Sequence, residues 1–266
     1  MGEKLWGGSP GTLTPGQSIY EDSTSAVHDI GERLQVGERI FYYGKTAAAC
    51  AAGLCCAPDE SVIGTNGLLG DGSCVLLAAE TVRKDQPAIT AALAVGNTWL
   101  AVTHASSLDN VVENSLQGGY IVLTDSAGIN QIYRIKYNSV IASDVVAIEL
   151  HDPIRTATAD ASTGVGMIQN PFNNLRPGIG DTDQNPSGAP QILIASGSYG
   201  WFQTFGPGMC LVEDDTAVAG SDAYLDDGSA GELHQKDDDT DVRVGYFMTD
   251  VTATSDAGLC MYQIMA

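Results

Sequence analysis

The sequence predicts a mainly β protein, built from antiparallel β-barrel or sandwich domains with an extended N-terminal arm and few short helices. Three observations favour this class. Short apolar and β-branched runs are separated by turns rich in Gly, Pro, Asn and Asp. Several of these runs alternate with a period of two. No segment of ten or more residues has a helical period, so helices are expected only as short pieces near 45–56 and 108–116.

The clearest strands lie in the middle of the chain. In QGGYIVLTDSAGINQIYRIKYN, two β-rich runs flank a tight connection, and alternate residues from Tyr133 to Tyr137 share one face. In DVVAIEL, alternate residues from Val146 to Leu150 do the same before Pro153 ends the run. These patterns predict a half-buried hairpin, and a third strand in the same sheet.

The stretch YGWFQTFGPG, Tyr199–Gly208, predicts another strand, which ends in a turn at 206–208. Alternation places the rings of Trp201 and Phe202 on opposite faces of this strand. Large rings on both faces favour packing inside a barrel or at a subunit contact over ligand binding. The residues predicted to contact another subunit or a partner protein are Trp6, Phe41, Tyr42, Tyr199, Trp201 and Phe205.

The domain organisation is predicted from shifts in composition. Residues 1–35 read as an extended arm, since the first 18 contain five glycines and two prolines with Trp6 as the large anchor. The segments 36–85 and 190–266 together form a barrel-like domain, 86–175 an inserted β domain, and 176–189 an irregular linker. Two consecutive β domains are the alternative.

Length and charge limit the class of protein. The 266 residues suffice for one large or two medium domains. With 33 acidic and 12 basic residues the net charge is −21, which disfavours binding to nucleic-acid phosphates. Neither a signal peptide nor an apolar stretch of about 18 residues is apparent. We therefore expect a soluble protein made in a cytosol, with no nucleic-acid or membrane partner.

The spacing of metal-ligating residues predicts no metal site and no cofactor. The six cysteines lie in apolar or small-residue stretches, and only Cys55 and Cys56 form a close pair, so reduced structural thiols are expected. The nearest match to a calcium loop, DAYLDDGSAGEL from Asp222, has its glycine one position late and Tyr224 at a ligand position.

The sequence predicts no catalytic residues. Its four histidines, His28, His104, His151 and His234, have no partner at a recognised catalytic or ligand spacing, and we expect them in exposed loops or at strand edges. No nucleophile elbow, HExxH or dinucleotide motif occurs. An acidic β-type glycan hydrolase stays open as an alternative, because two carboxylates from distant strands leave no local pattern.

The ordered segments GERIFYYGKTAAACAAG, GGYIVLTDSAGINQIYRIKYN, LHDPI, QNPFNN, SYGWFQTFGPGMCLV and VRVGYFMTD resemble a family of head structural proteins from tailed phages of aquatic bacteria. The resemblance runs from about residue 36 to the C-terminus. The chain departs from the family pattern in its cysteine content and in the large rings of Phe202 and Phe205.

This resemblance implies a non-enzymatic capsid decoration, or cement, protein of mainly β fold. It implies a homotrimer on the outer surface of an icosahedral shell, where the protein bridges neighbouring HK97-type major capsid subunits. Assembly would take place in the host cytoplasm. A head-fibre or tail protein that binds host glycan through its aromatic residues is the alternative.

Overall fold

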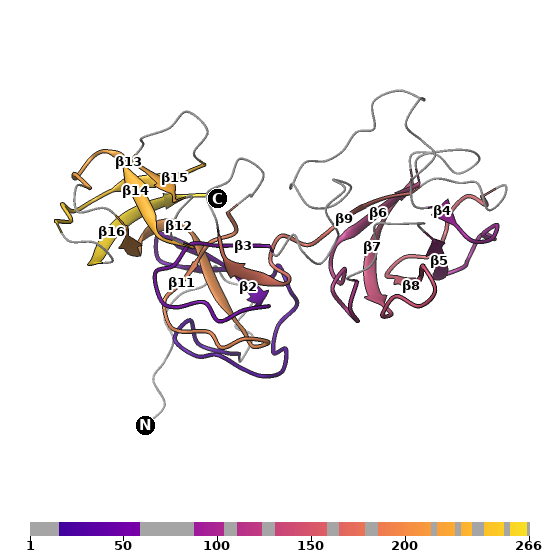
Figure 1. Ribbon diagram of the computed structural model, residues 1–266. Helices are drawn as coiled ribbons and strands as arrows, with labels where there is room; N and C mark the ends of the chain where they lie inside the picture. The colour runs from indigo at the N-terminus through magenta and orange to yellow at the C-terminus, as the bar shows by residue number, and fades with distance from the viewer. Residues whose placement is uncertain are drawn as a thin grey trace, which may run out of the picture. The chain divides into compact units, whose positions relative to one another are not determined.

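The computed structural model describes residues 16–58, 88–103, 111–123, 131–158, 165–178, 186–213, 217–226, 230–235, 242–252 and 256–264. The chain divides into two compact units (Figure 1). Met1–Pro58 and Asn174–Ala266 form one, here called the split unit, and Asp59–Asn173 form the other, the inserted unit. All regular structure in the described residues is strand, which confirms the mainly β barrel prediction.

The split unit is organised around a closed ring of strands. Its strands are β1 (Arg33–Val36), β2 (Arg39–Lys45), β3 (Cys56–Pro58), β10 (Leu175–Pro177), β11 (Ala189–Pro190), β12 (Tyr199–Val212), β13 (Asp222–Leu225), β14 (Leu233–Gln235), β15 (Arg243–Phe247) and β16 (Asp256–Gln263). Strand β12 pairs with β14, and the ladder continues through β13, β15 and β16 back to β12. β2, with β1 beyond it, pairs with the first half of β12.

Strand β12 corrects the predicted turn at 206–208. The strand is 14 residues long, and Gly206, Pro207 and Gly208 continue its ladder with β16. A register shift between Gln203 and Phe205 marks a bulge at the point where β12 passes from β2 to β16. The amide nitrogen Nε2 of Gln203 donates to the carbonyls of residues 205, 206 and 207 at 3.0–3.1 Å. These local bonds let the chain run on instead of turning.

The short helix expected near 45–56 is absent, because the chain there bonds to neighbouring segments. The backbone N–H of Ala47 donates to Leu175, that of Cys50 to Ile194, and that of Cys56 to Gly188. An extended chain whose amides are used in this way has none left for helical bonds. The second expected helix falls partly outside the described residues, and 111–118 contain turns.

In its described residues, the inserted unit contains one antiparallel sheet of six strands. They are β4 (Ala88–Ile89), β5 (Trp99–Thr103), β6 (Tyr120–Leu123), β7 (Gln131–Asn138), β8 (Val145–Leu150) and β9 (Val165–Ile168), in the order β4-β5-β8-β7-β6-β9. The predicted hairpin is β6–β7, and the predicted third strand is β8. Val146, Ile148 and Leu150 are buried in the core as their alternation requires.

A bulge in β7 changes which residues face the core at the end of the strand. Tyr133 and Ile135 point into the core, but the pairing with β8 shifts between Ile135 and Tyr137. Beyond this bulge Asn138 is fully buried and Tyr137 is only half-buried. Asn138 is satisfied by the backbone of a neighbouring loop, for its Oδ1 accepts from the N–H of Leu116 at 2.8 Å.

Candidate interaction site

The structure places the predicted contact residues in different environments. Phe41 is fully buried and Trp201 is 2% exposed, and both belong to a cluster with Ile19 and Tyr43 inside the split unit. Tyr42, Tyr199 and Phe205 are half-buried, with Tyr199 packed against the same cluster. Trp6 lies outside the described residues. The rings of β12 do pack on both faces, since Phe202 belongs to a second core cluster.

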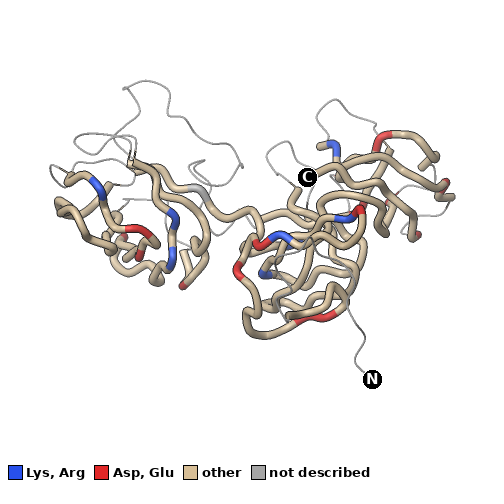
Figure 2. The backbone as a smooth tube through the Cα atoms, turned by 180° about the vertical axis from the view of Figure 1, so that it is seen from behind, with Lys and Arg blue, Asp and Glu red and all other residues tan. Residues whose placement is uncertain are grey.

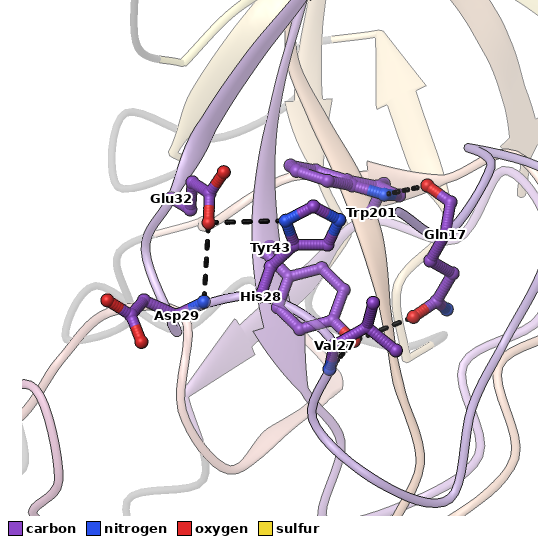
Figure 3. A network of polar contacts seen from close by, with 7 residues as sticks. All are labelled: Gln17, Val27, His28, Asp29, Glu32, Tyr43 and Trp201. Carbon is purple, nitrogen blue, oxygen red and sulfur yellow. Dashed lines mark hydrogen bonds and ion pairs between the residues drawn. The ribbon is translucent and has the colours of Figure 1, made fainter. Parts of the chain in front are cut away.

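The aromatic cluster holds the first described segment of the chain on the sheet (Figure 3). The indole Nε1 of Trp201 donates to the backbone carbonyl of Gln17 at 2.9 Å, and the hydroxyl of Tyr43 donates to the Oε1 of Gln17 at 2.7 Å. Burial raises the pKa of Tyr43 above its ordinary value, which keeps this hydroxyl protonated as a donor. Within the predicted arm, 1–35, residues from Gln17 onward therefore lie at a fixed place, and 1–15 lie outside the described residues.

Two histidines differ from the exposed positions that the sequence predicts. His28 packs 4.9 Å from the ring of Trp201, and its Nδ1 lies 3.2 Å from a carboxylate oxygen of Glu32 (Figure 3). His234 is 2% exposed, with Nδ1 3.8 Å from Asp226. In the sequence, the one indication of this contact is that Glu32 follows His28 by four residues. His151 is exposed as predicted, and His104 lies outside the described residues.

The best candidate for contact with another protein is an apolar outer face of the split unit. Three neighbouring strands, β12, β16 and β15, present two rows of apolar side chains away from the core. One row runs across Pro207, Met261 and Tyr246, and the next across Met209, Leu259 and Met248. We call this surface the methionine face, and it consists of Pro207, Met209, Leu211, Tyr246, Met248, Leu259 and Met261.

Alternation along the strands explains why these side chains point outward. Between them, small or core residues such as Gly208, Cys210, Cys260 and Tyr262 are buried on the inner face of the ring. Met248 is 41% exposed and Leu259 46% exposed, while the other members are half-buried. Three of the six methionines of the chain lie on this face. Contiguous apolar surface of this kind is typical of protein-interaction sites.

Sequence reasoning missed the methionine face because its strands read as continuous apolar runs. In GPGMCLV and GLCMY, however, small Gly and Cys alternate with large Met and Leu. In these two segments the small residues face the core together with Val212 and Tyr262, and the large Met and Leu side chains face outward. The pattern of residue size was thus the signal that hydrophobicity alone does not give.

The core of the split unit contains several buried thiols. Five of the six cysteines are described, and all five are buried free thiols: Cys50, Cys55, Cys56, Cys210 and Cys260. Burial raises the pKa of Cys55 to about 12, because a thiolate would lose its hydration there. A contact with Cys210, followed by burial, also raises the pKa of Cys260. Cys55 and Cys260 are therefore neutral packing residues at physiological pH.

Among the residues that the structure describes, no group of three or more His, Cys, Asp or Glu side chains is placed to hold a metal ion. Within the same residues no helix has the length and apolar character needed to span a membrane. Comparisons of the chain with protein-family models, with curated proteins and with solved structures gave no match.

Proposed function

We propose that this protein is a non-enzymatic capsid decoration protein, which binds the outer surface of an icosahedral phage shell and bridges neighbouring HK97-type major capsid subunits. The observation that carries the proposal is the methionine face. It offers a firm, largely apolar surface on three paired strands, and such a surface suits burial against another protein. The motif resemblance described above supports the same role and a homotrimeric state.

The chemistry of the face favours a protein partner. Met248 and Leu259 are the most exposed members, and methionine side chains adapt their shape to a partner surface. At one edge Arg243 bonds to Asp222 at 2.8 Å and to Gln263 at 3.1 Å, which gives the apolar rows a polar border. An apolar centre with a polar rim is the usual anatomy of a protein interface.

Two further features fit a protein that coats a particle in many copies. Lys and Arg occupy few and separated positions along the described backbone (Figure 2), in a chain with a net charge of −21. A strongly acidic coat repels both other particles and nucleic acid. The bonds from Trp201 and Tyr43 to Gln17 also fix the point at which the glycine-rich residues 1–15 join the split unit. We propose that these residues contact a neighbouring subunit on the shell.

The proposal is tested by binding of the purified chain to phage shells assembled without it. Wild-type protein should co-sediment with the shells and raise their resistance to heat. Leu259→Glu places a charge in the centre of the methionine face and should weaken binding about tenfold or more, since buried interface positions carry most of the affinity. Equal binding by this variant and wild type would contradict the assigned contact.

The matched control is Leu193→Glu. Leu193 is 61% exposed, in the same unit but outside the three strands of the methionine face. The variant carries the same change of charge and size, so it should bind as wild type does. Failure of both variants to bind would point to general charge repulsion instead of a specific surface.

A further inference from the structure

The inserted unit carries an outward row of side chains that the proposed function does not use. Trp99 on β5 lies directly across from Glu149 on β8, and Glu149 lies directly across from Tyr137 on β7. The three strands are neighbours in the sheet (Figure 1). Trp99 is 50% exposed, and its ring centroid lies 5.9 Å from that of Tyr137 at an angle of 60°.

The next outward row has only small side chains on the two strands β5 and β8. It contains Ala101 on β5 and Ala147 on β8, which are paired directly. Both alanines are half-buried and have no atoms beyond Cβ. A flat ring could therefore rest on this row against the side chain of Trp99. The result is a shallow platform with one aromatic wall.

Polar groups on and next to the row Trp99–Glu149–Tyr137 bond to one another beside this platform. The hydroxyl of Tyr137 donates to Glu113 Oε1 at 2.8 Å, and Lys136 Nζ donates to Glu149 Oε1 at 2.8 Å. The hydrogen bond to Glu113 raises the pKa of Tyr137, so the phenol remains neutral. Each carboxylate has a second oxygen that can accept, and the ammonium of Lys136 has further N–H groups that can donate.

The balance of these groups selects the class of ligand. Lys136 opposes a cation, and the two glutamates oppose an anion. A neutral ligand with many hydroxyl groups matches both the donors and the acceptors, and one apolar face of a sugar ring suits an indole wall.

We propose that the row Trp99–Glu149–Tyr137 is a binding site for neutral carbohydrate. The indole of Trp99 packs against the apolar face of a pyranose ring that lies over Ala101 and Ala147. The carboxylates of Glu149 and Glu113 and the ammonium of Lys136 bond to its hydroxyl groups. This site lies in the inserted unit and does not depend on the capsid role proposed for the split unit.

Native gel electrophoresis of the full chain tests the proposal, because polymer in the gel retards a protein that binds it. The probes are three neutral polysaccharides (a glucan, a mannan and a galactan), anionic alginate and cationic polylysine. At least one neutral polymer should retard the wild type. Trp99→Ala should raise the dissociation constant about tenfold or more, while Trp99→Phe, which keeps a ring, should have a smaller effect.

The control is Tyr120→Ala, which removes another exposed aromatic residue, 44% exposed on β6 of the same unit, outside the row. It should be retarded like the wild type, and circular dichroism should show all variants folded. The proposal is overturned if no neutral polymer retards the wild type or if Trp99→Ala is retarded equally. Retardation by alginate or polylysine alone also overturns it. So does a result in which Trp99→Ala weakens binding to phage shells while no sugar polymer binds the wild type.

Discussion

The bulge in β12 gives the sharpest prediction about stability. Gln203 is fully buried, and its Nε2 lies 3.0–3.1 Å from three backbone carbonyl oxygens. Replacing it by leucine keeps the approximate size and removes both N–H donors. The carbonyls of residues 205–207 then lose this partner inside the strand that links β2 to β16.

The expected loss in the free energy of unfolding follows from the number of N–H groups on the Gln203 side chain. An amide has two N–H groups, so at most two full hydrogen bonds are lost. Each buried acceptor left without a partner costs about 1–3 kcal/mol, and Gln203→Leu should therefore lower the free energy of unfolding by roughly 2–6 kcal/mol. With a urea dependence of about 2 kcal/mol per molar, the midpoint should fall by about 1–3 M.

The assay is urea unfolding followed by the fluorescence of Trp201, in a chain with Trp6 and Trp99 replaced by phenylalanine. Gln35→Leu is the matched control, because Gln35 also donates to a carbonyl, that of Gly37 at 3.1 Å, but at an exposed position. Its free energy of unfolding should change by less than about 0.5 kcal/mol. Equal midpoints for the two variants would refute the role assigned to Gln203.

Two further predictions concern the split unit. Above pH 9 its stability should fall as pH rises, because thiols ionise near their ordinary pKa in the unfolded chain, while burial raises the pKa of Cys55 to about 12 in the folded one. Each such thiol lowers the free energy of unfolding by about 1.4 kcal/mol per pH unit in this range. Measured by urea unfolding, the free energy of Cys55→Ala should therefore fall less steeply with pH than that of the wild type. An equal dependence on pH in the two proteins would contradict this. Trp201→Phe removes the N–H group that donates to Gln17 and should lower the free energy of unfolding by about 1 kcal/mol. It should also speed amide hydrogen exchange in residues 17–32. The control Tyr20→Phe, at a 58% exposed position, should have neither effect.

Strong local periodicity made the inserted unit predictable. The hairpin β6–β7 and strand β8 follow the alternation of the sequence because one face of each strand is buried. The departure at Tyr137 comes from a bulge, which adds one residue and reverses the faces beyond it. A single sequence does not reveal where such a register shift falls.

The split unit was harder to predict because its strands pair with segments that are distant in the sequence. Gly206–Gly208 has the residues of a turn, yet pairing with β16 and the side chain of Gln203 keep the chain extended. Tertiary pairing thus overrode local turn chemistry. The buried pair of His234 and Asp226 also joins residues eight apart, a spacing that predicts no contact.

The central claim, that this chain coats a capsid, is tested most directly by its copy number on the particle. Quantitative mass spectrometry of purified phage heads should give the amount of this chain relative to the major capsid protein. The proposed role predicts hundreds of copies per head, released together when the shell is stripped. A handful of copies, or none that sediments with the heads, would contradict it.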